Sequence, residues 1–136
     1  MADTSANPDT TYLALDVSPR RIGFAVSYGR LAFGRGYLHR GKQAEDIQGI
    51  QQKMQQEEAT EVVIGLPLRT DGLASKQAQK VRALGHALRQ AGITVHYQDE
   101  RYTTLSAEED LNGRRRSKGE LDEASAVRIL QLFLEQ

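Results

Sequence analysis

The chain has 136 residues, which is enough for one domain with a single hydrophobic core. Its 39% hydrophobic and 26% charged residues are typical of a soluble globular protein, and the absence of Cys excludes disulfides and thiolate zinc sites. The sequence begins with no signal-peptide pattern and has no apolar run of membrane-spanning length. We therefore expect a cytoplasmic protein with no membrane partner.

Net charge is zero, with 18 basic and 18 acidic residues, but the charges are unevenly distributed. From Arg20 to Lys42 there are six Lys or Arg residues and no acid, and a second basic cluster occupies 114–118. Such segments can bind phosphates locally even in a neutral protein. The alternative is that they only keep the surface soluble, and the charge pattern does not decide between the two.

The first ten residues are polar and are expected to form a disordered tail, and residues 11–136 are expected to form one domain. Three strands are predicted in succession, separated by turn-forming sequences, at about 11–18, 22–28 and 31–39. Because the links between them are short, we expect antiparallel hairpins.

The remainder of the chain alternates between helical and strand patterns. In chain order the pattern predicts a helix, a strand, a helix, a strand and two helices, at 43–56, 61–66, 75–90, 93–99, about 103–111 and 121–136. Pro67 is expected to help end its strand, and 112–120 is expected to be a polar, basic loop. Right-handed crossovers would make the later strands parallel, which predicts an α/β fold with a mixed five-stranded sheet flanked by helices.

Three carboxylates fall at positions where such a fold could bring them together. Asp16 lies within an apolar strand, Glu100 closes the strand that begins near residue 93, and Asp122 lies on the sheet-facing stripe of the last helix. Converging buried carboxylates repel each other unless cations lie between them, and carboxylate oxygens suit Mg²⁺ or Mn²⁺. The alternatives are a solvent-facing Asp16, a Glu100 paired with a nearby cation, and an Asp122 that only matches the helix dipole.

Four segments, taken in order, resemble the motifs of the YqgF family, which is also called RuvX. They are 15–27 (LDVSPRRIGFAVS), 65–72 (GLPLRTDG), 99–104 (DERYTT) and 122–131 (DEASAVRILQ). The resemblance implies a ribonuclease H-like fold. Members of the family are described as Holliday junction resolvases or as nucleases that mature the 5′ end of pre-16S rRNA.

The resemblance further implies that Asp16, Glu100 and Asp122 are the catalytic metal ligands. We expect two Mg²⁺ or Mn²⁺ ions, about 3.5–4 Å apart, with Asp16 as the bridging ligand. Basic residues in or beside the motifs are candidate contacts for substrate phosphates, namely Arg21, Arg69, Arg101, Arg114, Arg115 and Arg116.

Three positions depart from the family pattern. Ser18 replaces a Gly that would allow a turn with positive φ, Tyr28 stands where the family often has Asp, and Ser125 stands where a fourth acid would lie. None of these departures removes a predicted metal ligand. We expect Ser18 and Tyr28 to affect substrate fit more than catalysis. With Ser125 in place of a fourth acid, the site has three carboxylates, and we expect metal occupancy to depend on the substrate phosphate.

The resulting functional hypothesis is a metal-dependent nuclease that acts on structured RNA, with pre-16S rRNA as the target. The main alternative is a Holliday junction resolvase acting on branched DNA, which would require a homodimer to make two symmetric cuts. A nucleic-acid-binding module without catalysis is a third possibility. A sugar kinase or actin-like ATPase is disfavoured because the nucleotide needs two such domains and no Gly-rich phosphate loop is present.

Overall fold

The computed structural model describes residues 6–68, 75–101 and 117–136. The described elements are, in chain order, β1 (Tyr12–Val17), β2 (Arg21–Tyr28), β3 (Leu31–His39), α1 (Gln43–Glu57), β4 (Glu61–Leu68), α2 (Lys76–Gln90), β5 (Thr94–Arg101) and α3 (Lys118–Leu134). No helix within these ranges is long and apolar enough to cross a bilayer.

The five strands form one mixed sheet in the order β3-β2-β1-β4-β5. The first three strands are antiparallel neighbours, whereas β4 runs parallel to β1 and β5 runs parallel to β4. This arrangement confirms the predicted α/β fold, including the hairpins and the crossovers.

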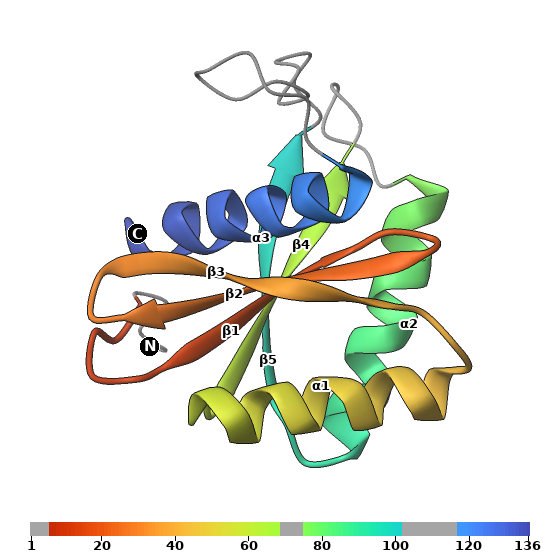
Figure 1. Ribbon diagram of the computed structural model, residues 1–136, viewed down its shortest axis with the longest axis horizontal. Coiled ribbons are helices and arrows are strands. Elements are labelled where there is room, and N and C mark those ends of the chain that lie inside the picture. Colours follow the sequence, from red (N-terminus) through yellow and green to blue (C-terminus); the bar gives the residue numbers. More distant parts are fainter. Residues whose placement is uncertain (1–5, 69–74, 102–116) are drawn as a thin grey trace.

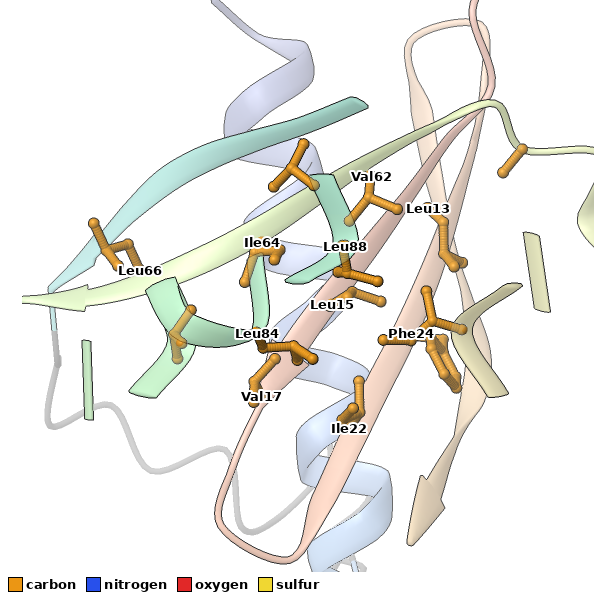
Figure 2. Packing of buried hydrophobic residues seen from close by; sticks show 14 of the residues in the cluster. Leu13, Leu15, Val17, Ile22, Phe24, Val62, Ile64, Leu66, Leu84 and Leu88 are labelled. Atoms are coloured by element: carbon orange, nitrogen blue, oxygen red, sulfur yellow. The ribbon is translucent and has the colours of Figure 1, made fainter. Parts of the chain in front are cut away.

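Helices cover both faces of the sheet, with α3 on one face and α1 and α2 on the other (Figure 1). Side chains alternate along β1, so Leu13 and Leu15 pack toward α1 and α2, whereas Tyr12 and Ala14 pack toward α3. Figure 2 shows the first of these two clusters. Because β1 is buried on both faces, a charged side chain on it has little access to water.

Helix α3 starts three residues earlier than predicted. Ser117 accepts a hydrogen bond from Glu120 N at 3.1 Å, so the part of the predicted loop from Lys118 to Glu120 forms the first helical turn instead. The predicted helix at 103–111 and the rest of the predicted loop, 112–116, lie outside the described residues.

Strand β4 continues through Pro67 to Leu68, so the predicted end at Leu66 was wrong. Pairing with β1 stops at Leu15–Ile64, and beyond that point β4 pairs only with β5. Pro67 therefore lies where β4 has a strand neighbour on one side only, which is the kind of position where proline is tolerated in a sheet.

Residues 6–10, which were assigned to the tail, make a turn against the domain. Thr10 N donates to Asn7 O at 3.0 Å, and Asn7 N donates to the Tyr12 hydroxyl at 2.9 Å. These contacts join the start of the described chain to β1.

Helix α3 touches the sheet backbone at glycines of β2 and β3. A Cβ placed on Gly23 would lie 2.1 Å from the carbonyl oxygen of Asp122, so only glycine allows this approach. Next to it, Glu123 accepts a 2.5 Å hydrogen bond from Gly36 N, at the bulge that shifts the β2–β3 register. The two contacts fix the position of Asp122 over the sheet.

Replacing Gly23 with Ala should therefore be strongly destabilising. The added methyl group would meet the rigid backbone of α3, and we expect the free energy of unfolding to fall by about 2–3 kcal/mol in urea titrations. Gly49→Ala in α1 is the matched control, because its Cβ would meet only the flexible end of Leu38 and alanine favours the helix. Equal effects of the two substitutions would contradict the close approach.

Candidate active site

The three predicted carboxylates lie at one edge of the sheet, where β1 and β4 separate. Asp16 directly follows Leu15, the last β1 residue paired with β4. Glu100 lies near the end of β5, opposite Pro67 of β4. The carboxyl ends of parallel strands meet at such an edge, which is where α/β sheets usually hold ligands.

The carboxylates also lie on the same face of the sheet. Asp16 is two and four residues from Ala14 and Tyr12, which pack against α3. On β5, the His96 ring lies 5.3 Å from Phe133 of α3, and Glu100 follows it by four residues. Both acids therefore face α3, which carries Asp122.

Gly65 of β4 makes room for this arrangement. A Cβ at this position would lie 2.3 Å from Cδ1 of Ile129 and 3.3 Å from Oε2 of Glu100. Any larger residue would push α3 outward and displace the Glu100 carboxylate. The sequence alone was also compatible with Gly65 serving only as a turn residue at the end of a strand.

Asp16 is the electrostatic centre of the site. Burial, followed by the charges of Glu100 and Asp122, raises the pKa of Asp16 from 3.8 to about 8. A side-chain hydrogen bond with Ser125 acts in the opposite direction and lowers this pKa. Without a cation, Asp16 is therefore held mainly in its neutral form at pH 7.

Glu100 is perturbed by the same surroundings. Burial raises the pKa of Glu100, while the charge of Arg128 on α3 lowers it. The Arg128 contribution was not anticipated from the sequence, because it depends on how α3 is placed over β5.

Arg21 is paired with one of the acids. Its Nε lies 2.7 Å from Oδ2 of Asp122, and the two side chains are only 17% and 15% exposed. Since little of either side chain reaches water, removing one partner would leave the charge of the other poorly solvated and uncompensated. Arg21 was predicted as a phosphate contact, and it lies within the site, where it is engaged by Asp122.

The turn before Arg21 explains how the Ser18 departure is accommodated. The Ser18 hydroxyl donates to Arg21 O at 2.9 Å and accepts from Arg21 N at 3.1 Å. Ser18 does not adopt a positive φ, so glycine is not required for this turn. These hydrogen bonds stiffen the β1–β2 hairpin beside Asp16.

The other predicted substrate contacts cannot be placed in the site by their side chains. Arg101 is the last residue of β5, and only its backbone is described. Arg69, Arg114, Arg115 and Arg116 lie outside the described residues.

The chemistry of the donor set fits a hard divalent cation, since carboxylate oxygens are its preferred ligands. Mutual repulsion around Asp16 also favours a positive charge at this point. Within 6–68, 75–101 and 117–136, however, no three His, Cys, Asp or Glu side chains are grouped closely enough to hold an ion. A bound cation would draw the carboxylates together and would compete with Arg21 for Asp122.

Comparisons of the sequence with a family model and with curated relatives agree on one family. The model described as "RuvX: Holliday junction resolvase" matches residues 10–136. "Ribonuclease YqgF" of Deinococcus radiodurans is 51% identical over 124 residues, which cover 91% of this chain and 87% of the relative. "Putative pre-16S rRNA nuclease" of Thermus thermophilus is 46% identical over 127 residues, which cover 89% of this chain and 94% of the relative.

One solved structure of lower similarity is RuvC of T. thermophilus in complex with a Holliday junction substrate. It is 15% identical with a TM-score of 0.49, and the match covers 93% of this chain and 94% of that chain.

The raised pKa of Asp16 makes stability depend on pH in the metal-free protein. Because the folded state keeps a proton that the unfolded state has released between about pH 4 and pH 8, the stability of the wild type should fall as pH rises through this window. The substitution Asp16→Asn removes this pH-dependent loss of stability. The free energy of unfolding of the variant, relative to that of the wild type, should therefore rise toward pH 8 by at most about 1.4 kcal/mol per pH unit.

Urea unfolding from pH 4.5 to 8.5 in chelator would measure this difference. The same exchange at exposed Asp99 on β5 controls for the loss of a carboxylate. A variant no more stable than the wild type at pH 8 would contradict a neutral Asp16.

Arg21→Gln should separate stability from cation affinity. Without Mg²⁺, Asp122 loses its partner, and we expect the free energy of unfolding to fall by roughly 1–3 kcal/mol. With Mg²⁺, no arginine competes for Asp122, so the thermal stabilisation per added Mg²⁺ should exceed that of the wild type. Thermal unfolding across a Mg²⁺ titration measures both effects, and an identical Mg²⁺ response in the two proteins would rule out the competition.

Proposed function

Because the chain belongs to the RuvX family, we propose that it is a divalent-metal-dependent nuclease that hydrolyses phosphodiester bonds in structured RNA. The observation that carries this proposal is the gathering of Asp16, Glu100 and Asp122 at one sheet edge, where burial, followed by the charges of Glu100 and Asp122, raises the pKa of Asp16 to about 8. A protein that only bound nucleic acid would gain nothing from gathering repelling acids beside phosphates.

We propose Asp16, Glu100 and Asp122 as the residues that hold Mg²⁺ or Mn²⁺, with Asp16 shared between two ions. When bound, the ions would supply the Lewis acidity and the activated water needed for attack on phosphorus. The chain's own contribution is to position the carboxylates and to exclude water from the α3 side of the edge.

Arg21 has a second task in this proposal. If Asp122 contacted a cation, the guanidinium group of Arg21 would be free to bind the substrate phosphate. Its planar donors suit phosphate oxygens, and the stiffened Ser18 turn keeps it close to Asp16. Arg69, Arg101, Arg114, Arg115 and Arg116 are proposed as further phosphate contacts, on the strength of their positions in or beside the family motifs.

Tyr37 adds a surface for a base. It pairs with Gly23, which in turn pairs with Asp16, so the three residues lie in one row across the sheet. The ring packs on Gly119 in the first turn of α3 and is 42% exposed. A base stacked there would lie on the same face as the carboxylates.

Pre-16S rRNA, cut to its mature 5′ end, is the proposed substrate, because relatives that are 46% identical or less carry that name. Such a substrate would place the protein in the cytoplasm. Branched DNA is the second candidate, favoured by the description of the matching family model. Resolution of a junction would additionally require a homodimer with two sites that face opposite strands.

A cleavage assay tests the proposal. End-labelled structured RNA and a four-way DNA junction are offered side by side to the wild type and to Asp16→Asn, with Mg²⁺, with Mn²⁺ and with chelator. We expect metal-dependent cutting by the wild type and a loss of at least about 10³-fold in the variant, because the shared ligand is gone.

The preferred substrate in the same assay distinguishes RNA processing from junction resolution. Asp99→Asn, on the same strand as Glu100, should retain activity. Binding of either substrate without any cutting would instead indicate a nucleic-acid-binding module.

A further inference from the structure

Helix α2 carries positive charge and contains no acidic residue of its own. Between residues 72 and 98 the sequence contains no Asp or Glu. The helix presents five basic side chains, all exposed, which are Lys76, Lys80, Arg82, His86 and Arg89. In a chain whose net charge is zero, this is a marked local excess.

These charges are not neutralised by the described part of the fold. No ion pair within the described residues involves α2. The guanidinium carbons of Arg82 and Arg89 lie 5.4 Å and 5.2 Å from the centroid of the Tyr97 ring, and Arg89 donates to Val95 O at 2.7 Å. These contacts orient the two side chains without supplying a negative charge.

Such a helix is electrostatically unfavourable on its own. Lys76 and Lys80 are four residues apart, and like charges at this spacing repel each other on a helix. An anionic partner would remove this repulsion.

The helix begins at the edge that holds the carboxylates. Ser75 donates from its hydroxyl to Pro67 O at 3.1 Å, and Gln77 donates from Nε2 to Val17 O at 3.1 Å. Val17 follows Asp16, and Pro67 pairs with Glu100. Figure 1 shows α2 (green) running away from this edge on the face of the sheet opposite α3.

We propose that the exposed face of α2 binds the phosphates of the nucleic-acid strand that leaves the active site over this edge. The inference rests on the proposed nuclease function and extends it to a flank of the substrate. Charges four residues apart are separated by about 6 Å along the helix axis, so the helix can contact several phosphates in succession. Lys76 is nearest the cut and Arg89 is farthest from it.

The charge of α2 also argues against a second copy of the chain as its partner. In a two-fold dimer through this face, the same basic residues of both copies would meet. A polyanion satisfies the charges, whereas self-association would increase their repulsion.

The test compares two variants with the same change in net charge. The α2 variant carries Lys76→Gln, Lys80→Gln and Arg82→Gln. The control carries Gln51→Glu, Gln52→Glu and Gln55→Glu, at exposed positions of α1. Each set lowers the net charge by three, so only the location of the change differs. Thermal unfolding confirms that both variants are folded.

Binding is measured in the Asp16→Asn background, with Mg²⁺, on a labelled structured RNA that has single-stranded flanks on both sides. For the α2 variant we expect affinity at low salt to fall about 10- to 100-fold, and the slope of log K against log salt to flatten by about two to three. The control should change affinity less than about threefold. Removing the flank that contacts α2 should lower the RNA affinity of the protein with an unsubstituted α2. The RNA affinity of the α2 variant should not change when the same flank is removed.

Two outcomes of the comparison with the control would overturn the inference. One is equal loss of affinity in the α2 variant and the control, and the other is a change in oligomeric state, by sedimentation, confined to the α2 variant. In the active background, the α2 variant should lower kcat/KM and leave kcat unchanged. If the unsubstituted chain cuts RNA but the α2 variant matches it at every salt concentration, the α2 inference alone fails. If the unsubstituted chain neither binds nor cuts, the proposed function fails.

Discussion

The arrangement of the site depends on how closely the backbone of α3 approaches β2. A helix normally stands off from a sheet by the thickness of its side chains, but at Gly23 no side chain intervenes. The approach brings Asp122 within reach of Arg21 and within electrostatic range of Asp16. Gly65 leaves room for the side chain of Ile129, farther along the same helix. The two glycines therefore determine how far apart the carboxylates lie.

This close packing concentrates negative charge where water is scarce. Asp16 responds by holding a proton, and Asp122 responds by pairing with Arg21. Each response lowers the electrostatic energy of the metal-free fold, and each must be reversed when a cation binds. The site is thus stable without metal, but its carboxylates bind a cation less tightly than they would if they were ionised and unpaired. Such a balance is common where function requires an arrangement that is unfavourable for folding.

The sequence predicted what depends on local pattern. Alternating apolar residues located the strands, and the three acids could be selected because each falls at a recognisable point of a strand or helix. It could not predict that Arg21 pairs with Asp122, since the two are 101 residues apart. The early start of α3 was missed because it depends on the N-cap Ser117. The continuation of β4 through Pro67 was missed because it depends on where β4 loses its pairing with β1. Both features depend on tertiary context.

A net charge of zero conceals two opposite regions that meet at one edge of the sheet. The carboxylates occupy the α3 face, and the basic side chains of α2 begin on the other face. Without a cation, the first region has no free positive charge to attract a phosphodiester, because Asp16 keeps its proton and Asp122 is paired with Arg21, whereas the second region attracts it. A nucleic acid would then be held by α2 but not drawn to Asp16. A bound cation would add positive charge to the first region, so that one polyanion could interact favourably with both. Cation binding and substrate binding would thus favour each other without any change in the fold.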